Sequence, residues 1–141
     1  MGSEMCIRDR VKEAWANVQT AYQRRADLIP NLVNTVRAAG DFEQETLQAV
    51  TEARARATSI NVSAEDVRDP EGLAQFQQAQ SQLSGALGRL LVVSENYPQL
   101  RATEGFRDLQ VQLEGTENRI NTARTRYNLS LIHISEPTRP Y

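Results

Sequence analysis

A single apolar stripe with helical spacing dominates the first third of this chain. Arg25 takes the one place in the series where an apolar residue is missing. Because 3.6 residues complete one helical turn, the spacing puts the stripe on one face of a long helix and predicts coiled-coil-like packing. The apolar members follow one another at steps of three or four residues, apart from the step that Arg25 fills: Val11, Trp15, Val18, Tyr22, Ile29, Leu32 and Val36.

Pro30 lies inside this predicted helix. A proline in a helix interior donates no backbone hydrogen bond and crowds the preceding turn, so a kink or a restart is expected. Asp27 would be the N-cap if the helix restarted. The stripe keeps its phase across Pro30, which favours one continuous but kinked helix that stops at Gly40.

Three further segments, at about 41–59, 70–97 and 106–128, repeat the helical pattern, and no strand-like alternation competes with it. Four amphipathic helices joined mostly by short corners predict an all-α fold, an elongated antiparallel four-helix bundle with coiled-coil-like packing. The expected inner faces are Phe42, Ala49, Val50, Ala53 and Ala57; then Leu73, Phe76, Leu83, Leu87, Leu90 and Leu91; then Phe106, Leu109, Leu113, Ile120, Ala123 and Tyr127, with Thr116 filling a gap.

Local signals mark the limits of these helices. Asp69 followed by Pro70 is a typical N-cap and first-turn pair for the third helix. Pro98 is expected to end or bend that helix before a corner. Gly85 and Gly88 lower its intrinsic helix propensity, so we expect a closely packed neighbour to compensate.

The two ends of the chain, MGSEMCIRDR and LSLIHISEPTRPY, do not continue these patterns. Back-translation shows that Gly2 to Asp9 and Ser130 to Glu136 can be encoded by opposite strands of one DNA segment, and the pair resembles the translated end of a sequencing adapter. We therefore predict a helical domain at 11–128, truncated at both ends, between adapter-derived tails at 1–10 and 129–141. Such tails should pack little against the domain, apart from helix propagation past Asn128.

Composition removes several function classes. Residues 11–128 contain no Cys, His or Met, which excludes thiol and imidazole chemistry and disulfides there. The chain's net charge of −2, with mixed signs, gives no electrostatic indication of nucleic-acid binding. Glu114 and Glu117 have the spacing of a carboxylate-bridged metal site, but the histidine that such sites need is absent. No apolar run is long enough to span a membrane. We expect no cofactor, no metal and no catalytic residue.

Three polar clusters interrupt the helical pattern: QRRADLIPNLVNTV at 23–36, ENYP at 95–98 and EGTENRI at 114–120. In one interpretation, their asparagines brace helix ends and kinks while their arginines pair with glutamates across the bundle. In the other, the clusters form a docking patch at one end of the bundle, with arginine as its anchor. The first interpretation involves Asn31, Asn96 and Asn118, and Arg24, Arg25 and Arg119 with Glu95, Glu114 or Glu117.

The same clusters carry a family resemblance. VKEAWANVQTAYQRRADLIPNLVNTV, LSGALGRLLVVSENYPQLRA and FRDLQVQLEGTENRINTARTRYN resemble the LemA family of bacterial proteins, in order and over essentially all of 11–128. The resemblance implies a long antiparallel helical bundle, a membrane helix or lipoprotein signal just upstream of Val11, and no established enzyme activity. The signature positions, to which we assign a structural or docking role, are Arg24, Arg25, Asp27, Pro30, Asn31, Glu95, Tyr97, Pro98, Glu114, Glu117, Asn118 and Arg119.

One segment, RAAGDFEQE at 37–45, departs from the family pattern at the first corner, so we assign no family role there. Taken together, the sequence favours a non-enzymatic protein of the bacterial cell membrane or envelope, tethered by a segment that this sequence lacks. It would act as a scaffold or protein-interaction module with an unidentified protein partner. Two alternatives stay open: a small-ligand-binding or enzymatic bundle with inward-facing Arg and Glu around a pocket, and a soluble coiled-coil oligomer.

Overall fold

A computed structural model of the chain describes residues 2–60, 62 and 70–135, and every regular element in these ranges is a helix. The all-α prediction is confirmed. The expected corner after Pro98 contains a short helix of its own, so the described residues form five helices and not four. They are α1 (Gly2–Ala38), α2 (Gln44–Ser59), α3 (Pro70–Ser94), α4 (Pro98–Arg101) and α5 (Glu104–Ser135).

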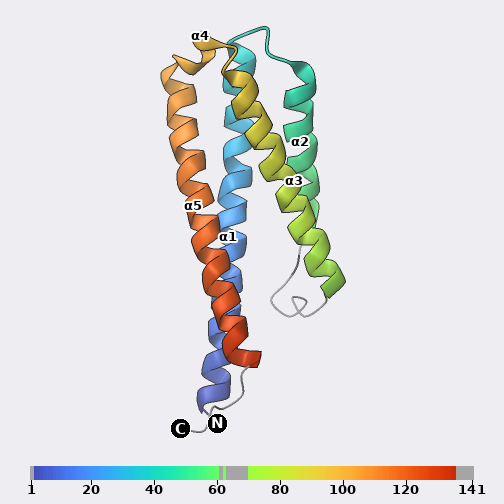
Figure 1. Cartoon of the computed structure of the whole chain (residues 1–141), viewed down its shortest axis with the longest axis vertical. Coiled ribbons are helices and arrows are strands. Elements are labelled where there is room, and N and C mark those ends of the chain that lie inside the picture. Colours follow the sequence, from blue (N-terminus) through green and yellow to red (C-terminus); the bar gives the residue numbers. More distant parts are fainter. Residues whose placement is uncertain (1, 61, 63–69, 136–141) are drawn as a thin grey trace.

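The long helices are arranged in two pairs (Figure 1). α1 and α5 lie side by side in opposite directions along most of their length, and α2 and α3 form a shorter pair against one side of them. At about 1.5 Å per residue, the 37 residues of α1 extend about 55 Å, so the molecule is elongated. The end of the α1–α5 pair that is remote from α4 extends beyond α2 and α3 (Figure 1).

Buried apolar side chains form two clusters along the long axis. The upper cluster, nearer α4, draws on all the helices, with Leu32, Val50, Leu90 and Phe106 essentially inaccessible to solvent. The lower cluster is built around aromatic rings, and the Trp15 ring centroid lies 5.4 Å from that of Phe76 and 5.0 Å from that of Tyr127. Contacts of this kind add about 0.5–1.5 kcal/mol each to the burial of the rings.

The predicted stripe of α1 is buried from Val11 to Val36. Gly40 has a φ of +77°, in the left-handed region, and therefore stops α1 as predicted. α2 begins at Gln44, later than expected, because Asp41 has a φ of +55° and cannot continue a helix. The assignment of Ala49 to the inner face was wrong: this residue is exposed, one step off the buried series Thr46, Val50, Ala53 and Ala57.

The expectation of a close neighbour at Gly85 and Gly88 was also wrong. Both residues are exposed, and a Cβ atom at either would meet nothing within 4 Å. They lie off the buried series Leu83, Leu87 and Leu90, which packs α3 against the rest of the molecule. The packing of these leucines therefore offsets the low helix propensity of the glycines.

α1 continues through Pro30, as predicted, and the structure shows how the missing hydrogen bond is replaced. In a regular helix, the carbonyl of Ala26 would accept the N–H of residue 30, which proline lacks. Here Nε of Arg54, from α2, donates to that carbonyl at 2.8 Å. Because the helix does not restart, Asp27 is not an N-cap, and its Oδ1 instead accepts a hydrogen bond from Nε2 of Gln23 at 2.9 Å.

Val62, a described residue of the connection between α2 and α3, is hydrogen-bonded to α1. The backbone carbonyl of the buried residue Val62 accepts hydrogen bonds from Nε1 of Trp15 at 2.9 Å and from Nε2 of Gln19 at 2.7 Å. Pro70 is the first residue of α3, as predicted, whereas its expected N-cap, Asp69, lies outside the described residues. Two donors on one carbonyl hold Val62 against the lower cluster.

α5 propagates past Asn128 to Ser135, as expected for its tail. Leu129 and Ile132 are 53% and 50% exposed, and Cys6 near the other end is also exposed. The adapter origin of the two tails stays a prediction. In the part of the chain that the structure describes, no helix has the length and apolar character needed to cross a membrane.

Candidate functional site

Arg25 is the most unusual residue of the interior. It occupies the gap in the α1 stripe, between Tyr22 and Ile29, and its relative exposure is 0%. Along α1, Arg25 lies between Tyr22 of the lower cluster and Ile29 of the upper cluster. It therefore separates the two clusters. A guanidinium group at such a position is costly to desolvate unless its donors are satisfied.

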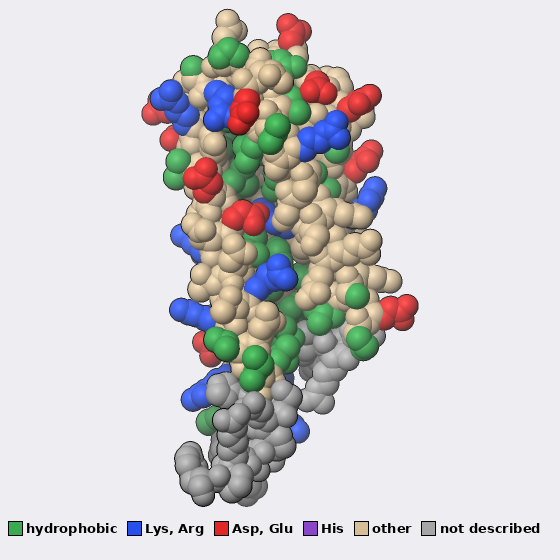
Figure 2. Space-filling model, in the orientation of Figure 1, with side chains coloured by type: hydrophobic (Ala, Val, Ile, Leu, Met, Phe, Trp, Pro, Cys, Tyr) green, Lys and Arg blue, Asp and Glu red, His purple; other side chains and the backbone are tan. Residues whose placement is uncertain are grey.

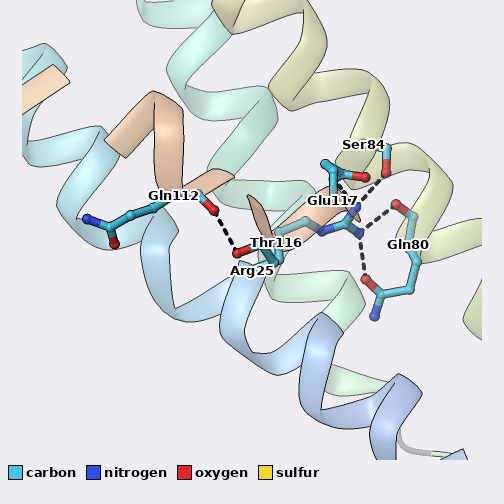
Figure 3. A network of polar contacts seen from close by, with 6 residues as sticks. All are labelled: Arg25, Gln80, Ser84, Gln112, Thr116 and Glu117. Atoms are coloured by element: carbon cyan, nitrogen blue, oxygen red, sulfur yellow. Dashed lines mark hydrogen bonds and ion pairs between the residues drawn. The ribbon is translucent and has the colours of Figure 1, made fainter. Parts of the chain in front are cut away.

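The guanidinium of Arg25 joins three helices (Figure 3). Its Nη1 donates to Oε1 of Glu117 on α5 at 2.9 Å and to Oγ of Ser84 on α3 at 2.6 Å. Its Nη2 donates to both the backbone oxygen and Oε1 of Gln80 on α3, at 3.0 and 2.8 Å. In the described part of the chain, Nε of Arg25 has no hydrogen-bond partner. Both terminal nitrogens are thus engaged by protein groups.

Near Arg25, polar residues interrupt the apolar stripes of α1, α3 and α5. Arg25 fills the gap in α1, Gln80 the gap between Phe76 and Leu83 in α3, and Thr116 the gap in α5. All three side chains are buried, and Oγ1 of Thr116 donates to the carbonyl of Gln112 within its own helix at 2.8 Å (Figure 3). We call Arg25, Gln80, Ser84, Thr116 and Glu117 the polar layer.

Electrostatics around the polar layer depend on burial. The Glu117 side chain is 41% exposed, so water screens its ion pair with Arg25 in part. The Arg25 guanidinium lies 5.2 Å from the Tyr22 ring centroid, a cation–π distance. Burial raises the pKa of Tyr22 above its usual value, with a smaller contribution from Glu117, against the lowering effects of Arg124 and Arg25. Burial also raises the pKa of Tyr127.

An open groove runs along the outer side of the α1–α5 pair. Its volume is about 1010 Å³, and residues of α1 between 7 and 24 and of α5 between 118 and 130 line it. Arg24, from the first polar cluster, and Asn118 and Arg119, from the third, are exposed and lie in its walls. We call this feature the α1–α5 groove.

The structure divides the predicted signature positions among four groups. Arg25 and Glu117 meet in the polar layer, and Arg24, Asn118 and Arg119 meet in the α1–α5 groove. Asp27, Pro30, Asn31 and Glu114 are exposed on the helices. Of the remaining three, Glu95 and Tyr97 lie between α3 and α4, and Pro98 begins α4, at the far end of the molecule, where the Tyr97 ring centroid lies 4.8 Å from that of Phe42.

This division corrects the first interpretation of the polar clusters. In the described ranges, Arg25–Glu117 is the one ion pair, so the expected pairing holds for Arg25 and is wrong for Arg24 and Arg119. The docking patch at one end stays a prediction, with Tyr97 of the second cluster packed against the same upper cluster as Ile29, Leu32 and Val36 of the first. The alternative with a pocket required inward-facing Arg and Glu charges; Arg25 faces inward, whereas Arg24 and Arg119 are exposed.

Several residues of the site were missed by sequence reasoning. Gln80 had a visible signal, because it is a polar residue at a stripe position of α3, as Arg25 is on α1. Ser84 and Arg54 had none, since their roles depend on which residues of other helices face them. In the ranges 6–60, 62 and 70–132, no group of three His, Cys, Asp or Glu side chains is placed to hold a metal ion.

Comparisons with known proteins agree on one family. The family model described as "LemA family" matches residues 14–134. Protein LemA of Metamycoplasma hominis is 25% identical to this chain over 121 residues, which cover 86% of this chain and 51% of that protein. The chain therefore spans about half the length of this curated relative. Since the family model matches most of its residues, the chain belongs to the LemA family.

Proposed function

We propose that this chain is the helical domain of a non-enzymatic LemA protein, tethered to the bacterial envelope and serving as a scaffold or protein-interaction module. Membership of the LemA family supports this proposal. We also propose that the fold is an antiparallel four-helix bundle with coiled-coil-like packing, in which α4 forms the corner between α3 and α5. The tether would be an apolar or lipidated segment upstream of Val11.

The single observation that carries the proposal is how the guanidinium of Arg25 is used. An enzymatic Arg/Glu cluster needs donors that are free to bind a substrate. Nη1 and Nη2 of Arg25 are instead engaged by Glu117, Ser84 and Gln80, and the residue is inaccessible to solvent. The polar layer therefore fits a structural role, in which it fixes the register of α1, α3 and α5.

The arginines outside the polar layer fit an interaction role. Arg24 and Arg119 are exposed and line one groove, and neither has an ion-pair partner among the described residues. Arginines with free donors at the edge of a concave surface are typical anchors in protein interfaces. This surface gives the scaffold proposal a physical place at which a partner could bind.

The proposal is tested by long-read sequencing of the native locus, followed by fractionation of cells that express the complete protein. We expect an apolar segment of about 20 residues, or a signal peptide that ends at a cysteine, upstream of Val11. The complete protein should then stay in the membrane fraction after a high-salt wash. A locus that encodes residues 1–10 natively, together with a protein found only in the soluble fraction, would refute the tether.

A further inference from the structure

The α1–α5 groove has the features of a helix-binding site. Resting on the proposed function, we propose that it binds an acidic amphipathic helix of a partner protein, with Arg24, Arg119 and Arg126 as the anchoring side chains. The partner would lie along the groove as a third helix against α1 and α5. Shape, residue spacing and charge each support this inference.

The lining residues repeat with the spacing of a coiled coil. On α1 the residues that line the groove include Ile7, Arg10, Ala14, Asn17, Ala21 and Arg24, at alternating steps of three and four. On α5 they include Arg119, Thr122, Arg126 and Leu129, again at steps of three and four. Two adjacent helices with this spacing present regularly placed holes, into which the side chains of a third helix can fit.

Small side chains leave room for a close approach. Ala14 and Ala21 on α1, and Thr122 and Ala123 on α5, line the groove between the arginines. Packed helices have interaxial distances of about 8–10 Å, and the shorter ones require small residues at the contact. From Ala14 to Arg24, at about 1.5 Å per residue, the α1 wall extends about 15 Å, about three helical turns, within residues 11–128.

The charge of the groove is opposite to that of the chain. Arg10, Arg24, Arg119 and Arg126 line it, with Glu13 as the one lining carboxylate, although the chain as a whole carries a net charge of −2. α5 contains no Asp or Glu from Asn118 to its end at Ser135. On the face drawn in Figure 2, acidic side chains gather towards the α4 end and basic ones predominate below. Complementarity therefore requires an acidic partner.

A concave groove favours a helix over a membrane surface. A flat bilayer would meet the exposed rims of α1 and α5 and could not reach Ala14 or Ala123 between them. Four of the lining residues lie in the predicted adapter-derived tails: Ile7, Arg10, Leu129 and Ser130. The proposal therefore rests on α1 from Ala14 to Arg24 and on α5 from Asn118 to Arg126, which lie within 11–128.

The test is a titration of the full chain with a fluorescent three-heptad peptide that carries Leu at a and d and Glu at e and g. Repulsion between its glutamates opposes self-association, which keeps it monomeric. A matched peptide with Lys in place of Glu is the control for charge. We expect the Glu peptide to bind about tenfold more tightly than the Lys peptide at low ionic strength, and added salt to weaken it.

Two double variants locate the binding. Arg24→Glu with Arg119→Glu should weaken the Glu peptide about tenfold or more, because both residues line the groove. Arg37→Glu with Arg89→Glu makes the same change of charge at two exposed arginines outside the groove and should alter affinity less than about twofold. All four substituted residues are exposed, and circular dichroism should show unchanged helicity in both variants.

Three outcomes would overturn the proposal: equal affinity for the Glu and Lys peptides, equal loss in the two double variants, or no binding of the Glu peptide. A fourth is groove-dependent binding of phosphatidylglycerol vesicles without peptide binding, which would assign the groove to an anionic membrane surface. None of these outcomes bears on the proposed membrane tether, because the tether is tested separately by sequencing the native locus. If the tether proposal is refuted, the peptide titration still tests the groove.

Discussion

Arg24 and Arg25 are neighbours in the sequence, and the molecule uses them in opposite ways. Arg25 faces inward, is inaccessible to solvent and bonds to α3 and α5, whereas Arg24 is exposed and lines the α1–α5 groove. A rotation of about 100° around α1 separates the two side chains. One helical step therefore decides whether an arginine stabilises the fold or remains available to a partner.

The largest effect on stability is expected at Arg25. Arg25→Ala leaves the buried Gln80 side chain without its partner and opens a cavity between the two apolar clusters. We expect a loss of about 3 kcal/mol in the free energy of unfolding, measured by urea denaturation. Arg25→Lys is the control, since it keeps the charge but not the fork of donors, and should lose less. A change under about 0.5 kcal/mol for Arg25→Ala would show that the polar layer does not stabilise the fold.

A smaller effect is expected at the proline of α1. Arg54→Ala removes the donor that replaces the missing N–H of Pro30 at the carbonyl of Ala26. Leaving this carbonyl unpaired should cost about 1–2 kcal/mol. In a Pro30→Ala background, the new backbone N–H can bond to Ala26, so Arg54→Ala should cost less there. Equal costs in both backgrounds, measured as a double-mutant cycle, would contradict this role for Arg54.

High pH should lower the free energy of unfolding through ionisation of Tyr22, whose ring lies next to Arg25 of the polar layer. Because burial raises its folded-state pKa above the unfolded value of 10.0, the unfolded state ionises first. The unfolded state then binds fewer protons than the folded state, so stability is complete below pH 10 and falls as pH rises above it. Tyr22→Phe should reduce this fall in a series of urea titrations from pH 8 to about pH 11. An unchanged pH dependence in the variant would assign the fall to other groups, Tyr127 first among them.

The smallest effect on stability is expected in the groove. Arg24→Glu with Arg119→Glu should change the free energy of unfolding by less than about 0.5 kcal/mol, since both side chains are exposed and outside the polar layer. The thermal midpoint of this double variant should match that of Arg37→Glu with Arg89→Glu. A large loss confined to the groove variant would mean that Arg24 and Arg119 also support the fold.

Much of the fold was predictable because the apolar stripes of α1, α3 and α5 are long and regular. The stop at Gly40, the continuous helix through Pro30 and the buried Thr116 follow from local physics, which neighbouring helices did not override. Ala49 was misplaced because alanine fits both faces of a helix, so its identity does not report burial. The glycines of α3 were misjudged for a similar reason, since low propensity does not require a close neighbour.

The site was predictable only in part. The interruption at Arg25 indicated a special position. The sequence left Glu95, Glu114 and Glu117 as candidate partners, because the pattern of a single helix does not reveal its register against another helix. Only the alignment of α1 with α5 selects Glu117. The hydrogen bond from Arg54 to Ala26 and the α1–α5 groove likewise depend on which surfaces meet in three dimensions. Gln80 was within reach, because it interrupts the α3 stripe as Arg25 interrupts that of α1.

The central claim is that the neighbouring residues Arg24 and Arg25 are divided between the groove and the fold, and arginine side-chain NMR tests it directly. In ¹⁵N-labelled chain at neutral pH, the Nη protons of Arg25, held by Glu117, Ser84 and Gln80, should give separate, slowly exchanging signals. Those of Arg24 and Arg119 should be averaged by rotation and fast exchange, as expected for exposed side chains. Loss of the slow signals in Arg25→Lys would assign them. Slow signals from Arg24, or none from Arg25, would contradict the division.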